Sequence, residues 1–273
     1  MRGASRNALA AAQERLDSLL DGATDAAAAL ALARPLLQVA ALLSDERALA
    51  RSLGDPGIDA SSRQALADAV FRGKVDDAVL DLIGVVTGGR WSQTDDLVDG
   101  VEALGAQAAF TAAERDSTLD DTEDELFRFA RIVDGAPELR AALSDAGTPV
   151  DVKQRLVRAL LDGKVGEVTL LLIDHVVAAP RGRPTDRAID DLAAQAAARK
   201  QRVIAVVTSA VPLTDEQSDT LAAALGRVLG HDVRLQPRVD PSILGGVVIR
   251  VGDELFDGSV QLRLAAARSL LTR

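Results

Sequence analysis

The chain has 273 residues and carries a formal net charge of −10 at neutral pH. This acidity argues against nucleic-acid binding, because phosphate contacts require Lys and Arg. The absence of cysteine excludes disulfides, thiolate metal sites and cysteine nucleophiles. Aromatic residues make up only 2% of the chain, so a core must be built from Ala, Leu, Val and Ile. At about 150 residues per domain, the length predicts about two domains.

Apolar residues recur at helical spacing through the first hundred residues. The pattern predicts five successive helices, over residues 5–20, 25–43, 45–53, 61–71 and 76–86. Asp59 is the expected N-cap of the fourth helix, and Gly73 is expected to stop it. A sixth helix is expected to begin after Ser92 as its N-cap.

The sequence also contains an internal repeat. A shift of 90 residues places residues 49–86 on residues 139–176 without a gap, and about 14 of about 38 positions are then identical. Residues 73–75 and 163–165 are both Gly-Lys-Val. This match predicts two copies of one helical unit.

The second copy predicts helices over residues 123–133, 138–143, 150–161, 167–177 and 186–202. Its first helix is expected within residues 101–115, so that one long helix ends the first copy and opens the second. Short antiparallel helices with links of about 2–8 residues pack as bundles. We therefore expect one helical bundle over residues 1–100 and a second over residues 101–202.

The hydrophobic period changes near residue 203. Residues 203–208 are apolar and mostly β-branched, which predicts a buried strand. The pattern then predicts a helix over residues 214–229, strands over 233–239, 246–251 and 254–256 joined by a hairpin turn at residues 252–253, and a final helix over 259–271. The predicted fold class is therefore α+β, with a duplicated six-helix unit followed by a small α/β domain over residues 203–273.

No stretch of the sequence reads as a membrane-spanning helix. The longest apolar stretches are residues 26–33 and 168–179, and Asp174 and His175 interrupt the second, whereas a spanning helix needs about 20 apolar residues. The N-terminal segment lacks the apolar region of a signal peptide. We expect a protein that stays in the cytosol and can dock on a membrane-bound partner.

An ordered set of residues over 239–271 carries a family resemblance. The set comprises Asp240, Gly245, Gly246, Arg250, Gly252, Asp253, Asp257, Gly258, Ser259 and Leu264. Residues 206–217 extend it upstream, and residues 181–183 provide a basic turn before the last helix of the second copy. This pattern resembles the delta subunit of bacterial F-type ATP synthase, a relative of the mitochondrial oligomycin-sensitivity-conferring protein.

The resemblance implies a role without catalysis. Members of this family are stator subunits, which link the catalytic alpha/beta head to the peripheral b stalk so that the head resists rotor torque during proton-driven ATP synthesis. It implies two partners, the N-terminal helices of the alpha subunit and the b subunit, and no cofactor, metal, nucleic acid or membrane insertion. It also implies a peripheral location on the cytoplasmic face of the cell membrane. Ordinary members have one helical bundle, and the duplicated form is similar to that of actinobacterial members.

Candidate partner-binding residues follow from this resemblance. For the head, we expect a groove on the second copy between its first and fifth helices, lined by Ala108, Phe110, Ala112, Leu170, Leu172 and Val176. The equivalent apolar set in the first copy keeps that copy open as an alternative, with Leu16, Leu80 and Leu82. For the stalk-binding domain, the candidates are Gly245, Gly246, Arg250, Asp257, Gly258 and Ser259.

Other functions compete with this interpretation. A repeat of helices alone also fits a generic helical-repeat scaffold with other partners. A nucleotide loop at Gly245-Gly246 is disfavoured, because these glycines precede a strand and no Lys follows. His175 is expected in the core or at its edge, and the acidic run 120–125 is expected to open a helix. Trp91 is either a core anchor or a partner contact.

Overall fold

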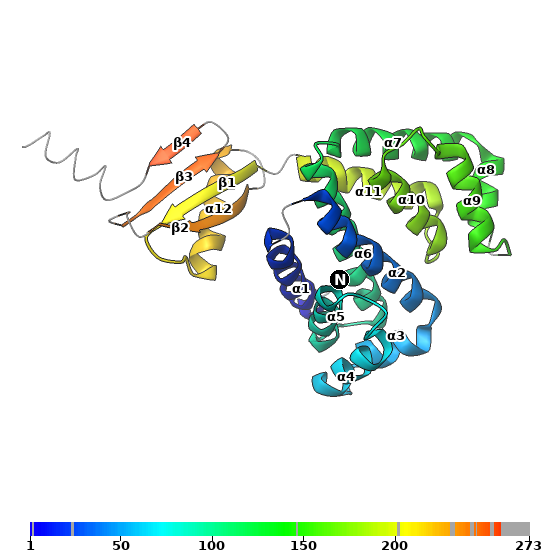
Figure 1. Cartoon of the computed structure of the whole chain (residues 1–273), viewed down its shortest axis with the longest axis horizontal. Coiled ribbons are helices and arrows are strands. Elements are labelled where there is room, and N and C mark those ends of the chain that lie inside the picture. The colour runs from blue at the N-terminus through cyan, green and yellow to red at the C-terminus, as the bar shows by residue number, and fades with distance from the viewer. Residues whose placement is uncertain are drawn as a thin grey trace, which may run out of the picture. The chain divides into compact units, whose positions relative to one another are not determined.

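A computed structural model describes residues 1, 3–22, 25–145, 147–200, 203–229, 233–240, 243, 245–251 and 254–257. The chain divides into two compact units, Met1–Ala196 and Ala197–Arg273. Figure 1 shows that the first unit is built of helices and that the second contains the strands. The predicted α+β class is therefore confirmed.

Eleven helices lie in the described part of the N-terminal region. They are α1 (Gly3–Gly22), α2 (Ala26–Asp45), α3 (Arg47–Gly54), α4 (Ala60–Phe71), α5 (Asp77–Gly88), α6 (Thr94–Arg115), α7 (Leu119–Gly135), α8 (Pro137–Ser144), α9 (Val150–Leu161), α10 (Glu167–Ala178) and α11 (Thr185–Lys200).

The helix boundaries confirm the repeat. Helices α8, α9 and α10 begin and end 90 residues after α3, α4 and α5. The long helix α6 is the sixth helix of the first copy and, by the same offset, the counterpart of α1 in the second. We call α1–α6 the first copy and α6–α11 the second copy. The predicted division between residues 100 and 101 falls inside this shared helix.

The turns repeat as closely as the helices. Gly73 and Gly163 follow α4 and α9 with φ angles of 75° and 66°, a left-handed conformation in which glycine is the residue of lowest cost. Asp55 accepts a hydrogen bond from the backbone N–H of Gly57 at 2.8 Å, and Asp145 accepts one from Gly147 at 3.0 Å. Each carboxylate thereby closes the turn before the fourth helix of its copy.

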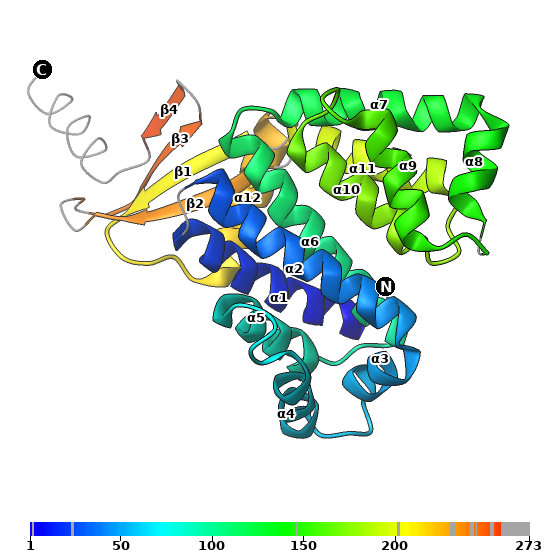
Figure 2. The same cartoon turned by 45° about the vertical axis from the view of Figure 1, so that its right-hand side comes forward.

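One continuous core joins the two copies, and it is built mostly from Ala, Leu, Val and Ile. Helix α2 lies along α6, as Figure 2 shows. From the short apolar runs we expected no helix able to span a membrane. Helix α2 nevertheless meets the length and composition of a membrane-spanning helix. However, 56% of that stretch is buried inside the protein, as expected for a core helix.

The C-terminal unit contains a four-stranded sheet with strand order β2-β1-β3-β4. Strand β1 (Val203–Ser209) leads through α12 (Asp215–Leu229) to β2 (Val233–Val239), which pairs with it in parallel. Strands β3 (Val247–Val251) and β4 (Glu254–Asp257) continue the sheet on the other side of β1 as antiparallel neighbours. Leu225 of α12 packs in a small core with Ala205, Val207 and Ile249.

Some local expectations need correction. The N-cap of α6 is Gln93 and not Ser92. The backbone N–H of Ser92 instead donates a hydrogen bond to the hydroxyl oxygen of Ser5 at 2.8 Å. Helix α7 begins at Leu119, four residues before the apolar pattern becomes regular. Trp91 is a core anchor, 2% exposed, and its indole N–H donates to the carbonyl of Val86. The expected hairpin turn at 252–253 and the final helix lie outside the described residues.

Candidate functional site

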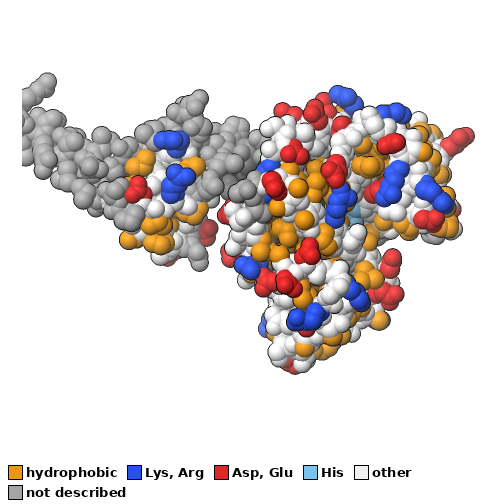
Figure 3. Space-filling view, viewed as in Figure 1, with side chains coloured by type: hydrophobic (Ala, Val, Ile, Leu, Met, Phe, Trp, Pro, Cys, Tyr) orange, Lys and Arg blue, Asp and Glu red, His pale blue; other side chains and the backbone are white. Residues whose placement is uncertain are grey.

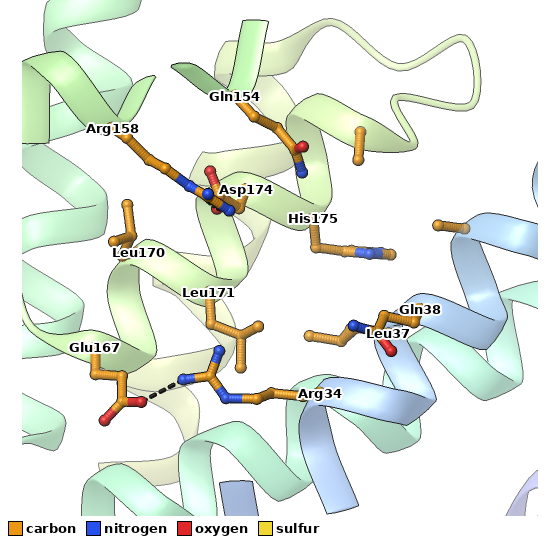
Figure 4. A pocket seen from close by; sticks show the side chains of 12 residues that line it. Arg34, Leu37, Gln38, Gln154, Arg158, Glu167, Leu170, Leu171, Asp174 and His175 are labelled. Carbon is orange, nitrogen blue, oxygen red and sulfur yellow. Dashed lines mark hydrogen bonds and ion pairs between the residues drawn. The ribbon is translucent and has the colours of Figure 1, made fainter. Parts of the chain in front are cut away.

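A cleft of about 450 Å³ separates α2 of the first copy from α9 and α10 of the second. Figure 4 shows Arg34, Leu37 and Gln38 on one wall, facing Leu171 on the other, and Leu170 also lines the cleft. The cleft is neither purely apolar nor of one charge. Its walls combine leucine side chains with amides and with two Arg–carboxylate pairs, a lining suited to contact with another polypeptide.

Two ion pairs lie in this cleft. Arg34 on α2 pairs with Glu167 at the start of α10, so that the pair bridges the two walls (Figure 4). Arg158 on α9 donates to one oxygen of Asp174 from its Nε at 2.9 Å and its Nη2 at 2.6 Å. The other oxygen, Asp174 Oδ1, is buried and has no hydrogen-bond partner.

A charged cluster lies behind the cleft, where α6 meets the turn between α10 and α11. Arg181 Nη1 lies 2.8 Å from Glu102 Oε2 and 2.5 Å from Asp99 Oδ1, and Arg183 Nη2 lies 2.5 Å from Glu102 Oε1. His175 Nε2 lies 3.5 Å from the same Glu102 oxygen. The cluster ties the last turn of the second copy to the shared helix.

The pKa of Glu102 is lowered, because this cluster favours the ionised carboxylate over the protonated acid. Burial, the largest single influence, acts to raise the pKa of Glu102. The nearby imidazole of His175, the hydrogen bond from Arg183 and the positive charge of Arg183 outweigh it, and together they lower the pKa to about 2. Glu102 is therefore ionised at any physiological pH.

The cluster is specific to the second copy. By the 90-residue offset, Arg181 takes the place of Trp91, and Glu102 takes the place of Ala12, which is completely buried in the first copy. Sequence reasoning identified the basic turn at residues 181–183 but not its acidic partner on α6. The signal was available, because an acidic residue stands at Glu102 where the repeat has a core alanine.

The first copy has its own version of the cleft, about 660 Å³, between α4 and α5. Asp77 stands there at the position of Glu167, and Leu80 at the position of Leu170. The residues that line this groove come from α4, α5 and the turn between them, and no further helix covers it as α2 covers the cleft of the second copy. The groove is therefore more open, and Asp81 on its wall pairs with Arg15 of α1 at 2.6 Å.

Most of the residues predicted to bind the head lie in the core. The buried ones, each 2% exposed or less, are Ala108, Phe110, Ala112, Leu172 and Val176. Only Leu170 is half-buried and lines the cleft. The expected groove between α6 and α10 is not open along α6, because α2 packs there: a Cβ added to Gly105 of α6 would lie 2.8 Å from Leu37. Head binding by these residues stays a prediction.

The candidates for stalk binding fall in the C-terminal unit. Gly245 and Gly246 precede β3 with φ angles of 137° and 82°, a backbone conformation that glycine adopts at low cost. Arg250 is exposed on β3 and lies opposite Val206 of β1 in the register. Asp257 ends β4, and its side chain, like Gly258 and Ser259, lies outside the described part.

The described residues offer little chemistry for catalysis. Among them, no group of three or more His, Asp or Glu side chains is placed to hold a metal ion. Asp120 and Asp121 lie in the first turn of α7. As expected, their negative charges lie at the positive end of the helix dipole, where they stabilise the helix. Figure 3 shows acidic and basic side chains interspersed over the helical unit, with no single-sign patch on the face in view.

The sequence is similar to those of known proteins. The sequence model of the family described as ATP synthase delta (OSCP) subunit matches residues 101–271. The chain is 47% identical over 267 residues to the ATP synthase subunit delta of Streptomyces griseus, with 98% of each chain covered. It is 42% identical to those of Acidothermus cellulolyticus and Thermobifida fusca, with 99% of each chain covered.

The chain is also similar to chains of solved structures. A chain of the Toxoplasma gondii mitochondrial ATP synthase hexamer is 19% identical, with 62% of this chain and 95% of that chain covered. The TM-score of this match is 0.29.

Proposed function

The chain belongs to the ATP synthase delta (OSCP) subunit family, and from that premise we propose that it is a stator subunit without catalytic activity of its own. Membership connects it with ATP synthesis and ion transport. In the proposed role it links the alpha/beta head to the peripheral b stalk, so that the head does not turn with the rotor. The family match over residues 101–271, together with full-length relatives, is the observation that carries this proposal.

The division into two compact units supports a linking role. A protein that joins two partners needs two surfaces, and here a helical unit and an α/β unit provide them on separate bodies. We assign the N-terminal helices of the alpha subunit to the helical unit. We assign the b subunit to the C-terminal unit, around Gly245, Gly246 and Arg250. The assembled protein would then lie on the cytoplasmic face of the cell membrane without entering it.

The alternative of a generic helical-repeat scaffold is less well supported. It accounts for the duplicated helices, but it does not account for the C-terminal unit, which the family match includes. A small hydrolase or transferase has still less support, since the sequence holds no nucleophile motif and the described residues include no group of side chains placed to hold a metal ion.

Reconstitution with the other subunits tests the proposal. The full-length chain should bind purified alpha/beta head and, separately, a soluble b-stalk fragment, and it should restore coupling of proton flow to ATP synthesis in vesicles depleted of it. The isolated chain should show no ATPase activity and no binding of MgATP by calorimetry. If the chain fails to bind either the head or the stalk, the stator role is refuted.

A further inference from the structure

The joint that precedes the sixth helix is apolar in the first copy and charged in the second. Before α6, Trp91 is 2% exposed and packs so closely on Gly100 that an added Cβ there would lie 2.5 Å from the ring. Ala12 of α1 is fully buried. Before α11, Arg181 stands in place of Trp91, and Glu102 stands in place of Ala12. The same joint is therefore held in two different ways.

Four residues change together at this joint. At the 90-residue offset the counterparts are Leu9 and Asp99, Ala12 and Glu102, Trp91 and Arg181, and Gln93 and Arg183. Two apolar residues have become acidic, and two uncharged residues have become basic. The four charged side chains pair with one another at 2.5–2.8 Å. A set of ion pairs has thus replaced apolar packing as a whole.

Stability alone does not account for this replacement. Burying ionised groups costs about as much as their attraction returns, and apolar side chains of similar volume often stabilise a fold as well or better. Charge-assisted hydrogen bonds instead add direction, because they require a fixed geometry, whereas apolar contact is non-directional. The backbone agrees with this reading: Arg181 has a φ angle of 51°, a left-handed conformation that persists in a residue with a Cβ only where the surroundings impose it.

Helix α11 is the element that the charged cluster orients. It begins at Thr185, two residues after Arg183, and continues as one helix to Lys200, although the helical unit ends at Ala196. Three of its five buried apolar residues are alanines, which make few packing contacts. These five are Ala188, Ile189, Leu192, Ala193 and Ala196. The other ion pair on α11, between Asp190 and Arg131 of α7 at 2.7 Å, is exposed and contributes modestly.

We propose that Asp99, Glu102, Arg181 and Arg183 set the direction in which α11 leaves the helical unit toward the C-terminal unit. They are positioning residues, and neither partner is assigned to them. The consequence for torque rests on the proposed function, because a stator that yields at this joint lets the head turn with the rotor.

Spin labels on the full-length chain measure the direction of α11. The chain has no cysteine, so cysteines introduced at the exposed Glu138 of α8 and Ala198 of α11 are the only labelling sites. Pulsed electron paramagnetic resonance then gives the distribution of distances between the two labels. Joint replacement of Glu102, Arg181 and Arg183 by Met keeps the bulk of the cluster without its charges. We expect this methionine variant to unfold at a temperature no lower than that of the wild type, with a distribution at least twice as broad.

Two controls separate the direction of α11 from general loosening. Labels at Glu14 of α1 and Glu138 of α8, both in the helical unit, should give the same width in the wild type and the methionine variant. Asp151→Asn with Arg155→Gln removes an exposed ion pair of α9 that does not involve α11, and it should leave the Glu138–Ala198 width unchanged.

A milder variant keeps the test independent of how well the methionine variant folds. Arg183→Gln introduces the residue of the first copy and should broaden the Glu138–Ala198 distribution to a smaller extent. In reconstituted vesicles the methionine variant should bind the head and the stalk with the affinity of the wild type and still lose at least half of proton-driven ATP synthesis. A purely structural role would not separate binding from coupling in this way.

The outcomes distinguish this inference from the proposed function. Equal Glu138–Ala198 widths in the wild type and in both cluster variants would overturn the inference, and so would equal broadening between the Glu14 and Glu138 labels. Broadening with full ATP synthesis would overturn the role in torque. If the wild type fails to bind the head or the stalk, the proposed function is refuted, while the measured direction of α11 still decides the role of the charged cluster.

Discussion

Replacement of Arg63 by Ala should destabilise the helical unit more than any surface change. The guanidinium of Arg63 is buried, 3% exposed, and donates to five backbone carbonyls. These acceptors, at 2.6–3.2 Å, belong to Asp55, Ile58, Thr87, Gly88 and Gly89. Three of them lie at the C-terminal end of α5, where a helix leaves carbonyls without intrahelical partners. The one side chain of Arg63 therefore provides donors both to the carbonyls at the C-terminal end of α5 and to those in the turn before α4.

The magnitude follows from the number of acceptors left without a donor. Each buried carbonyl that loses its partner costs about 1–3 kcal/mol, and water entering the space left by the side chain recovers part of this. We expect a loss of about 3–5 kcal/mol for Arg63→Ala. In a unit of this size each kcal/mol corresponds to about 2–4 °C in Tm.

Urea unfolding followed by far-ultraviolet circular dichroism measures this loss, because most of the described helices belong to one unit. Arg63→Lys should fall between wild type and Ala, since a buried lysine, Lys153, occupies the same position in the second copy. Arg72→Ala, which removes an exposed i,i+4 pair with Asp68, should have no measurable effect. An Arg63→Ala protein within about 1 kcal/mol of wild type would refute the reasoning.

Three further changes test other parts of the structure. Gly105→Ala should destabilise the helical unit by about 1–3 kcal/mol in urea unfolding, because its Cβ would lie 2.8 Å from Leu37, and an unchanged midpoint would contradict close packing of α2 on α6. Glu102 has a folded pKa of about 2 against an ordinary value of 4.5, so its contribution to stability is present above pH 4.5 and is lost as the pH falls toward 2. Glu102→Gln should flatten the pH dependence of Tm in that window, and an unaltered profile would rule out this carboxylate as the cause. Gly246→Val, at a φ angle of 82°, should strain the entry to β3 by at least about 1–2 kcal/mol and weaken b-stalk binding while the helical unit stays folded, and equal binding by the variant would remove the glycine from the stalk site.

The sequence predicted the helices well because each has a regular apolar face and a chemical stop. Residues 150–161 were placed correctly at both ends, and Asp59 caps α4 as expected, accepting from the backbone N–H of Ser62 at 2.9 Å. The start of α7 was missed because Asp120 and Asp121 hide its periodicity, although acidic residues favour a helix N-terminus. Local patterns thus located elements better than they located ends.

The partner-binding residues were harder to predict for a physical reason. A buried core and an apolar groove select the same residue types, so the spacing of Ala108 and Ala112 cannot tell one from the other. What decides between them is which helix covers α6, and that depends on the contact between Leu37 and Gly105, 68 positions apart in the chain. Glu102 and Arg183, which also pair, are 81 positions apart, and only the comparison of the two copies, not the local pattern, marks Glu102 as unusual.

The repeat also indicates why the array stops at two copies. The stripe that seats α2 on the second copy is Ala26, Leu30, Ala33 and Leu37, and the corresponding residues of the second copy are Asp116, Asp120, Glu123 and Phe127. Three apolar positions have thus become acidic, and a third copy packed there would have to bury carboxylates at a cost of several kcal/mol each. Terminal units of repeat proteins need such a polar outer face to stay soluble. Phe127 remains 54% exposed beneath the guanidinium of Arg131, which lies 5.6 Å from the ring centroid and shields it. The second copy therefore ends the array.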